Sequence, residues 1–79
     1  MATSNDIKTV FGQVLRTYRQ NAGLSQEALA FECDLHRTFI GMLERGERRA
    51  TIDTLFALAS ALDVSPHALI QDLEQRLSS

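Results

Sequence analysis

Residues 25–46 read SQEALAFECDLHRTFIGMLERG, and this stretch predicts two short helices joined by a tight turn. The first helix is expected from Gln26 to about Cys33. Ser25 would be its N-cap, because a serine hydroxyl accepts a hydrogen bond from the free amides of an opening turn. The second helix is expected from Arg37 to about Arg45. Small or apolar residues recur at the positions that would face inward, namely Ala30, Cys33, Ile40 and Leu43.

The turn between these helices holds Asp34 and Leu35. Such a turn often needs a residue with positive φ, and Asp is one of the few residues besides Gly that tolerates it. Two helices that cross at about 90–120° through a turn of this kind form a helix-turn-helix, which places its second helix in the DNA major groove. The stretch therefore predicts a DNA-binding motif.

The same stretch resembles the helix-turn-helix of the phage-repressor (Cro-like, XRE-type) family. The shared residues are Leu24-Ser25-Gln26, Leu29-Ala30, Ile40 and Leu43-Glu44-Arg45-Gly46. The runs Leu35-His36-Arg37-Thr38-Phe39-Ile40 and Glu44-Arg45-Gly46-Glu47-Arg48 are closer still to the controller proteins of restriction–modification systems. The resemblance covers roughly residues 11–69. It departs from the family at Asp34, where Gly is commoner, and at Gly41, where a larger polar residue often lies.

Length and composition set the limits of the fold. The chain has 79 residues, enough for one small domain over residues 1–79, and its apolar share of 44% argues against disorder. One cysteine cannot form an internal disulfide. No apolar run approaches the roughly 18 residues of a membrane span, and the start lacks the blocks of a signal peptide. A cytoplasmic protein is expected.

The net charge of −2 is unusual for a DNA-binding protein, but the basic residues are concentrated. Residues 36–50 hold four arginines against two glutamates, a net charge of +2, whereas residues 51–79 hold one arginine against four acidic residues, a net charge of −3. Charges near the phosphates matter more than distant ones, because salt screens the latter. The predicted second helix and the loop after it therefore form the basic face.

Three further helices are predicted around the motif. The first begins near Asn5 or Asp6, and Gly23 follows its end. Another is capped by Thr51, and a last one has Ser65 as N-cap and is expected to fray from residue 75 onward. The first helix has apolar residues at helical spacing, Ile7, Val10, Phe11, Val14, Leu15 and Tyr18. The expected fold is all-α, a five-helix bundle of the lambda-repressor-like DNA-binding type.

The resemblance assigns roles to several residues. In the family, the counterpart of Arg19 forms an ion pair with the glutamate at the end of the recognition helix, here Glu44; a solvated Arg19 is the alternative. The counterparts of Arg37 and Thr38 read bases. An arginine at the start of this helix can donate two hydrogen bonds to guanine.

Other residues of the two helices and of the loop after them are also expected to contact DNA. Gly41 and Met42 continue the base-facing side, although Met42 also fits a core position. His36 precedes a helix N-terminus, which favours phosphate, and the family counterpart of Gln26 hydrogen-bonds phosphate. The arginines after the helix are expected to contact the DNA backbone, or else to be solvated. The full expected set is Ser25, Gln26, His36, Arg37, Thr38, Gly41, Met42, Arg45, Arg48 and Arg49.

No metal site, cofactor or enzyme activity is predicted. Cys33, His36 and His67 are too few and too scattered for a structural zinc site. The sequence also lacks a Gly-rich phosphate loop and an obvious catalytic constellation.

The sequence thus predicts a transcription regulator of the controller type that binds an inverted-repeat operator in double-stranded DNA as a homodimer. It fixes neither the operator nor the sign of regulation. Acidic residues beside the DNA-facing side, Glu27, Glu32 and Asp34, suggest a contact with RNA polymerase, or a role in helix dipoles and solubility. The alternative function is an antitoxin or adaptor that mainly binds a protein. The expected dimer interface is Ile52, Phe56, Leu69, Ile70, Leu73 and Leu77.

Overall fold

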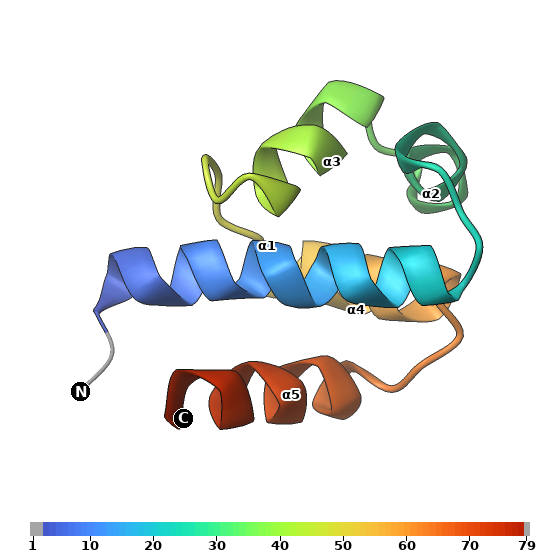
Figure 1. Ribbon diagram of the computed structural model, residues 1–79. Helices are drawn as coiled ribbons and strands as arrows, with labels where there is room; N and C mark the ends of the chain where they lie inside the picture. The colour runs from blue at the N-terminus through green and yellow to red at the C-terminus, as the bar shows by residue number, and fades with distance from the viewer. Residues whose placement is uncertain (1–2, 79) are drawn as a thin grey trace.

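The computed structural model describes residues 3–78, and this part of the chain contains five α-helices and no strand. Figure 1 shows α1 across the middle of the molecule, with α5 on one side of it and α2 and α3 on the other. The predicted all-α, five-helix fold is confirmed. The helices are α1 (Ser4–Asn21), α2 (Gln26–Cys33), α3 (Arg37–Glu44), α4 (Ile52–Ala61) and α5 (Pro66–Ser78).

The first helix begins slightly earlier than predicted. Thr3 is its N-cap, and the Thr3 hydroxyl accepts a hydrogen bond from the Asp6 amide at 3.2 Å. The Asp6 carboxylate in turn accepts from the Thr3 amide at 3.1 Å, which completes a capping box. The prediction that Asn5 or Asp6 caps the helix was therefore wrong, because Asp6 lies at the third helical position and bonds back to Thr3.

Short side chains cap the starts of α2, α4 and α5 as expected. The Ser25 hydroxyl accepts a hydrogen bond from Ala28 N at 3.0 Å, and Thr51 accepts one from Thr54 N at 3.1 Å. The Ser65 hydroxyl accepts from Ala68 N at 3.1 Å at the start of α5. These caps satisfy amides that have no partner inside the helix.

The turn of the motif has the predicted left-handed residue. Asp34 has φ 56° and ψ 42°, and the next residue's amide bonds back to Ala30 O at 2.9 Å. Gly23 also has positive φ, at 73°, after α1. Two further positions have positive φ, Gly46 at 74° after α3 and Asp63 at 58° after α4, and that of Asp63 was not predicted.

The core lies where α1 packs against α3 and α5, and where α4 packs against α2 and α5. Gly12 allows the closest of these approaches, because a Cβ atom there would lie 2.4 Å from the carbonyl oxygen of Leu43. The backbones of α1 and α3 are therefore in direct contact, and this contact sets the distance between the two helices. The buried apolar residues are Phe11, Val14, Leu15, Leu29, Ala30, Ile40, Leu43, Leu55, Leu58, Ala59, Leu62, Leu69 and Leu73.

Two residues assigned to the dimer interface lie in this core instead. Leu69 is fully buried, and Leu73 is 9% exposed. Both pack inside a single chain, so Leu69 offers no contact surface for a second one, and Leu73 only borders the hollow beside the exposed residues. The correction leaves Ile52, Phe56 and Ile70 exposed and Leu77 half-buried on α4 and α5.

The last helix also differs from the prediction, whereas Cys33 packs against the core as its inward position predicts. Instead of fraying from residue 75, α5 is regular to Ser78, whose hydroxyl donates to Glu74 O at 2.9 Å. Cys33 is half-buried, and its thiol lies 3.6 Å from Ala57 O. Burial, with a smaller contribution from the charge of Glu32, raises the pKa of the Cys33 thiol.

Candidate nucleic-acid interface

A buried ion pair fixes the C-terminal end of α3. Arg19 Nε lies 2.6 Å from Glu44 Oε2, and Arg19 Nη2 lies 3.1 Å from Glu44 Oε1. Only 12% of the arginine side chain and 3% of the glutamate side chain are exposed. The hydrogen bond to Glu44 holds the pKa of Arg19 above its ordinary value. A third guanidinium nitrogen, Nη1, donates to Leu24 O at 2.8 Å, so the pair also holds the loop before α2.

Gln26 joins α2 to the same carboxylate. Its Nε2 donates to Glu44 Oε1 at 3.0 Å, a contact that the sequence did not suggest. An amide NH₂ group has two donors, so one remains for the phosphate contact expected of this residue. A phosphate bound there would consequently be held at a fixed distance from α3.

The first turn of α3 points into solvent. Arg37 and Thr38 are both exposed, as is His36, whose side chain makes no capping hydrogen bond. Residues from both helices of the motif line a shallow hollow of about 240 Å³ on this side, which we call the DNA-facing hollow. Its lining consists of Gln26, Arg37, Thr38, Gly41 and Arg45, all of which belong to the predicted contact set.

Two other predicted contacts are less accessible. Met42 is half-buried, which suits the core alternative as well as a partial contact. Gly41 is buried, because the Arg45 side chain covers it: a Cβ atom on Gly41 would lie 2.9 Å from Arg45 Nη1. Approach of a DNA backbone to Gly41 itself would require Arg45 to move.

The arginines after α3 have partners that the sequence did not reveal. Arg45 pairs with Glu47, with Nε at 2.9 Å from Oε2 and Nη2 at 3.3 Å from Oε1. This contact raises the pKa of Arg45 and lowers the pKa of Glu47. The Arg48 guanidinium lies 5.9 Å from the centre of the Phe39 ring, a cation–π distance. Both pairs depend on the path of the loop, which helical periodicity does not predict.

Residues 3–78, which the structure describes, show no sign of a metal centre or a membrane span. No group of three or more His, Cys, Asp or Glu residues there could hold a metal ion. None of the described helices is long and apolar enough to cross a membrane.

The first turn of α3 exposes Arg37 and Thr38, and Gln26 of α2 is hydrogen-bonded to Glu44 at the other end of α3. This arrangement is that of a DNA-binding helix-turn-helix. In agreement, a helix-turn-helix family model matches residues 15–69. The chain therefore belongs to this family, of the XRE type. The proteins of this family are regulatory and bind DNA through the helix-turn-helix.

Control proteins are prominent among its relatives. The control protein C.BamHI of Bacillus amyloliquefaciens is 46% identical over 68 residues, which cover 85% of this chain and 84% of that protein. C.SmaI of Serratia marcescens is 48% identical over 65 residues, covering 82% and 77%. The crystal structure of the restriction–modification controller protein C.AhdI from Aeromonas hydrophila is 45% identical, with a TM-score of 0.76, and the match covers 81% of this chain and 96% of that one.

Proposed function

We propose that this protein is a transcription regulator of the restriction–modification controller type, which binds an inverted-repeat operator as a homodimer. The observation that carries the proposal is the exposed first turn of α3 at the edge of the DNA-facing hollow. Arg37 can donate two hydrogen bonds to guanine O6 and N7, worth about 1–3 kcal/mol of discrimination. Thr38 beside it can hydrogen-bond a base or place its methyl group against thymine.

The test is selection of bound sites from a randomised pool of duplex DNA at moderate salt. We expect an enriched inverted repeat with the unchanged protein, and loss of a base preference in each half-site with Arg37→Ala. Arg16→Ala removes the same charge from an exposed position on α1 and should select the unchanged repeat. Enrichment of no sequence, with only weak salt-sensitive binding, would contradict the proposal.

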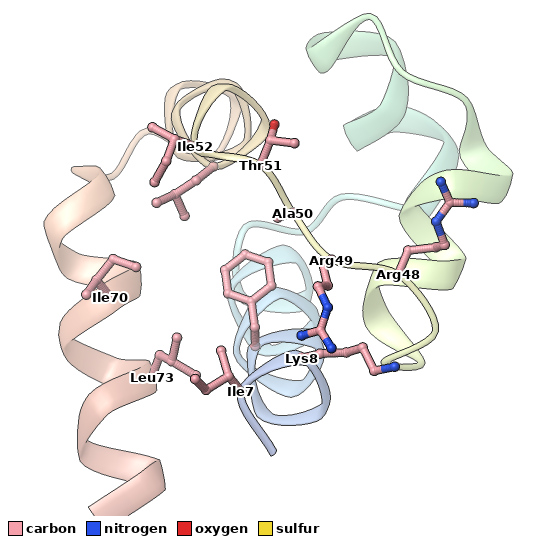
Figure 2. A pocket seen from close by; sticks show the side chains of 11 residues that line it. Ile7, Lys8, Arg48, Arg49, Ala50, Thr51, Ile52, Ile70 and Leu73 are labelled. Atoms are coloured by element: carbon pink, nitrogen blue, oxygen red, sulfur yellow. The ribbon is translucent and has the colours of Figure 1, made fainter. Parts of the chain in front are cut away.

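The proposed dimer uses the outer side of α4 and α5. Ile52 is 69% exposed, Phe56 58% and Ile70 43%, which is unusual for large apolar side chains near one another. Figure 2 shows Ile52 and Ile70 facing across an apolar hollow of about 200 Å³, with Leu73 and Ile7 beside them. A second copy of the chain would remove this surface from water. Dimerisation would also supply the second α3 that an inverted repeat requires.

A contact with RNA polymerase is a second element of the proposal. Phe31 on α2 is 84% exposed, and exposed Glu27, Glu32 and Asp34 surround it in sequence. Negative side chains would be repelled by DNA, so this surface suits a protein partner that is basic and partly apolar. Reversing the charge of Glu27 and Glu32 should abolish transcription activation and spare operator binding. Loss of both properties together, or of neither, would contradict this contact.

The control proteins and regulators among the relatives favour this function over an antitoxin or adaptor. An adaptor would use the motif to bind a protein and would not need the base-reading first turn of α3. Copurification of a small partner protein, together with failure of site selection, would favour the adaptor instead.

A further inference from the structure

Gly41 leaves the middle of the recognition helix without a side chain, and Arg45 occupies the space. Arg45 lies one turn after Gly41, and its side chain folds back along α3 so that Nη1 is 2.9 Å from the position a Gly41 Cβ would take. The guanidinium therefore borders the DNA-facing hollow together with Arg37 and Thr38. A residue that the sequence suggested for the DNA backbone thus lies on the base-reading side.

Glu47 favours one orientation of this guanidinium, in a pair whose side chains are 58% and 53% exposed. Its carboxylate binds the side of the group that carries Nε and Nη2, at 2.9 and 3.3 Å. A guanidinium has five N–H donors in a rigid plane, so a pair on this side leaves the Nη1–Nη2 edge able to donate two parallel hydrogen bonds. Because Nη1 lies over Gly41, that edge borders the DNA-facing hollow.

We propose that Arg45 determines specificity by donating to O6 and N7 of a guanine through its Nη1–Nη2 edge. In this arrangement Gly41 provides the room and Glu47 acts as a positioning residue. The inference rests on the proposed operator binding and adds to it a second arginine-read base in each half-site, one turn of α3 beyond the base read by Arg37.

The contact with Glu47 favours a base over a phosphate as the partner of Arg45. A phosphate next to Glu47 would be repelled by the carboxylate. Guanine presents two neutral acceptors, so the arginine can bind the base and keep its ion pair at the same time. The Glu47 charge would then raise selectivity by opposing register shifts that bring a phosphate to this point.

The experiment measures affinity for the selected operator and for a set of its single-base variants, by fluorescence anisotropy at one salt concentration. The variants are Arg45→Ala, Gly41→Ala and Glu47→Gln, with Arg16→Ala as the charge-matched control on α1. Gly41→Ala is the sharpest of them, because it keeps every charge and crowds the Arg45 guanidinium most closely, with Nη1 at 2.9 Å from the added Cβ and Gln26 Oε1 at an ordinary contact distance of 3.6 Å. Thermal unfolding of each variant checks that the fold is kept.

We expect Arg45→Ala to lose discrimination at one guanine per half-site by about fivefold to 150-fold, with the other positions unchanged. Gly41→Ala and Glu47→Gln should weaken discrimination at that same position and no other. The control should match the unchanged protein at every position.

An equal loss of affinity for all duplexes with Arg45→Ala, together with a smaller salt dependence, would overturn the inference and make Arg45 a phosphate contact. An unchanged preference in Gly41→Ala would overturn it as well. Both outcomes would leave the proposed operator binding intact. Failure of the unchanged protein to prefer any duplex would overturn the proposed function and this inference together.

Discussion

Glu44 at the end of α3 accepts hydrogen bonds from two other helices, from Arg19 of α1 and from Gln26 of α2. At a carboxylate whose side chain is 3% exposed, these donors take the place of water. The same three residues hold α3 at a fixed position relative to the phosphate contact expected of Gln26. We therefore expect stability and DNA recognition to depend on the same buried group.

Removing the arginine from this pair should be costly. Arg19→Leu would leave the Glu44 carboxylate buried with Gln26 as its one remaining side-chain donor, and the expected loss of unfolding free energy is about 3–5 kcal/mol. Urea unfolding followed by circular dichroism measures it. Arg16→Leu, at an exposed position of the same helix, should change stability by no more than about 0.5 kcal/mol. Similar values for the two variants would show that the buried pair contributes little.

The pair was predictable, but its surroundings were not. The resemblance to a family named Arg19 and Glu44, whereas the third partner, Gln26, depends on a side-chain angle that no periodicity encodes. Arg45 is a similar case, because its ion pair with Glu47 forms across a loop of irregular backbone. The sequence thus named candidate contact residues but not the side-chain contacts among them, and their binding to DNA stays a prediction.

Among the elements, α1 and α3 depend on one glycine. Gly12 lets the α1 backbone touch the carbonyl oxygens of Leu43 and Glu44, and a Cβ atom there would lie 2.4 and 2.6 Å from them. Gly41 is different, since a Cβ atom there meets only side-chain atoms. We therefore expect replacement by alanine to be tolerated at Gly41 and to destabilise the fold at Gly12.

Gly12→Ala should destabilise the protein by about 1–3 kcal/mol, because the backbones of two helices must separate. Gly41→Ala should leave stability unchanged or raise it by up to about 1 kcal/mol, since alanine favours helices and the Arg45 side chain can move away. Thermal unfolding of both variants under one buffer provides the comparison. Equal effects would contradict the close contact between α1 and α3.

Caps and turns explain why the helices were predicted well. Ser25, Thr51 and Ser65 bond to amides close by in sequence, and Asp34 adopts the left-handed turn without help from distant residues. Cap hydrogen bonds and turn conformations that involve only neighbouring residues can be predicted from the sequence alone. Leu69 and Leu73 were assigned wrongly because an apolar stripe looks the same whether it faces its own core or a second chain.

The whole molecule combines a basic recognition side with an acidic remainder. The net charge is −2, yet four arginines lie within residues 36–50. Weak binding to unrelated DNA is expected from the acidic total, so selectivity must come from base contacts. A dimer would strengthen the preference for the operator over unrelated DNA, because its two copies of α3 would contact two half-sites at once.

The dimer can be tested with two exposed phenylalanines. Phe56→Glu places a charge on the outer side of α4, and we expect a monomer in analytical ultracentrifugation with at least tenfold weaker operator binding, equivalent to about 1.4 kcal/mol. Phe31→Glu makes the same change on α2, away from that side, and should remain a dimer. The proposed interface would be wrong if Phe56→Glu stayed dimeric or if only Phe31→Glu dissociated.

The central claim is that two copies of α3 enter successive major grooves of one operator. A hydroxyl-radical footprint on the selected duplex tests it most directly. We predict two protected tracts related by two-fold symmetry, with half-site centres about 10–10.5 base pairs apart on one face of the DNA. A single tract, or tracts without that symmetry and spacing, would contradict the account.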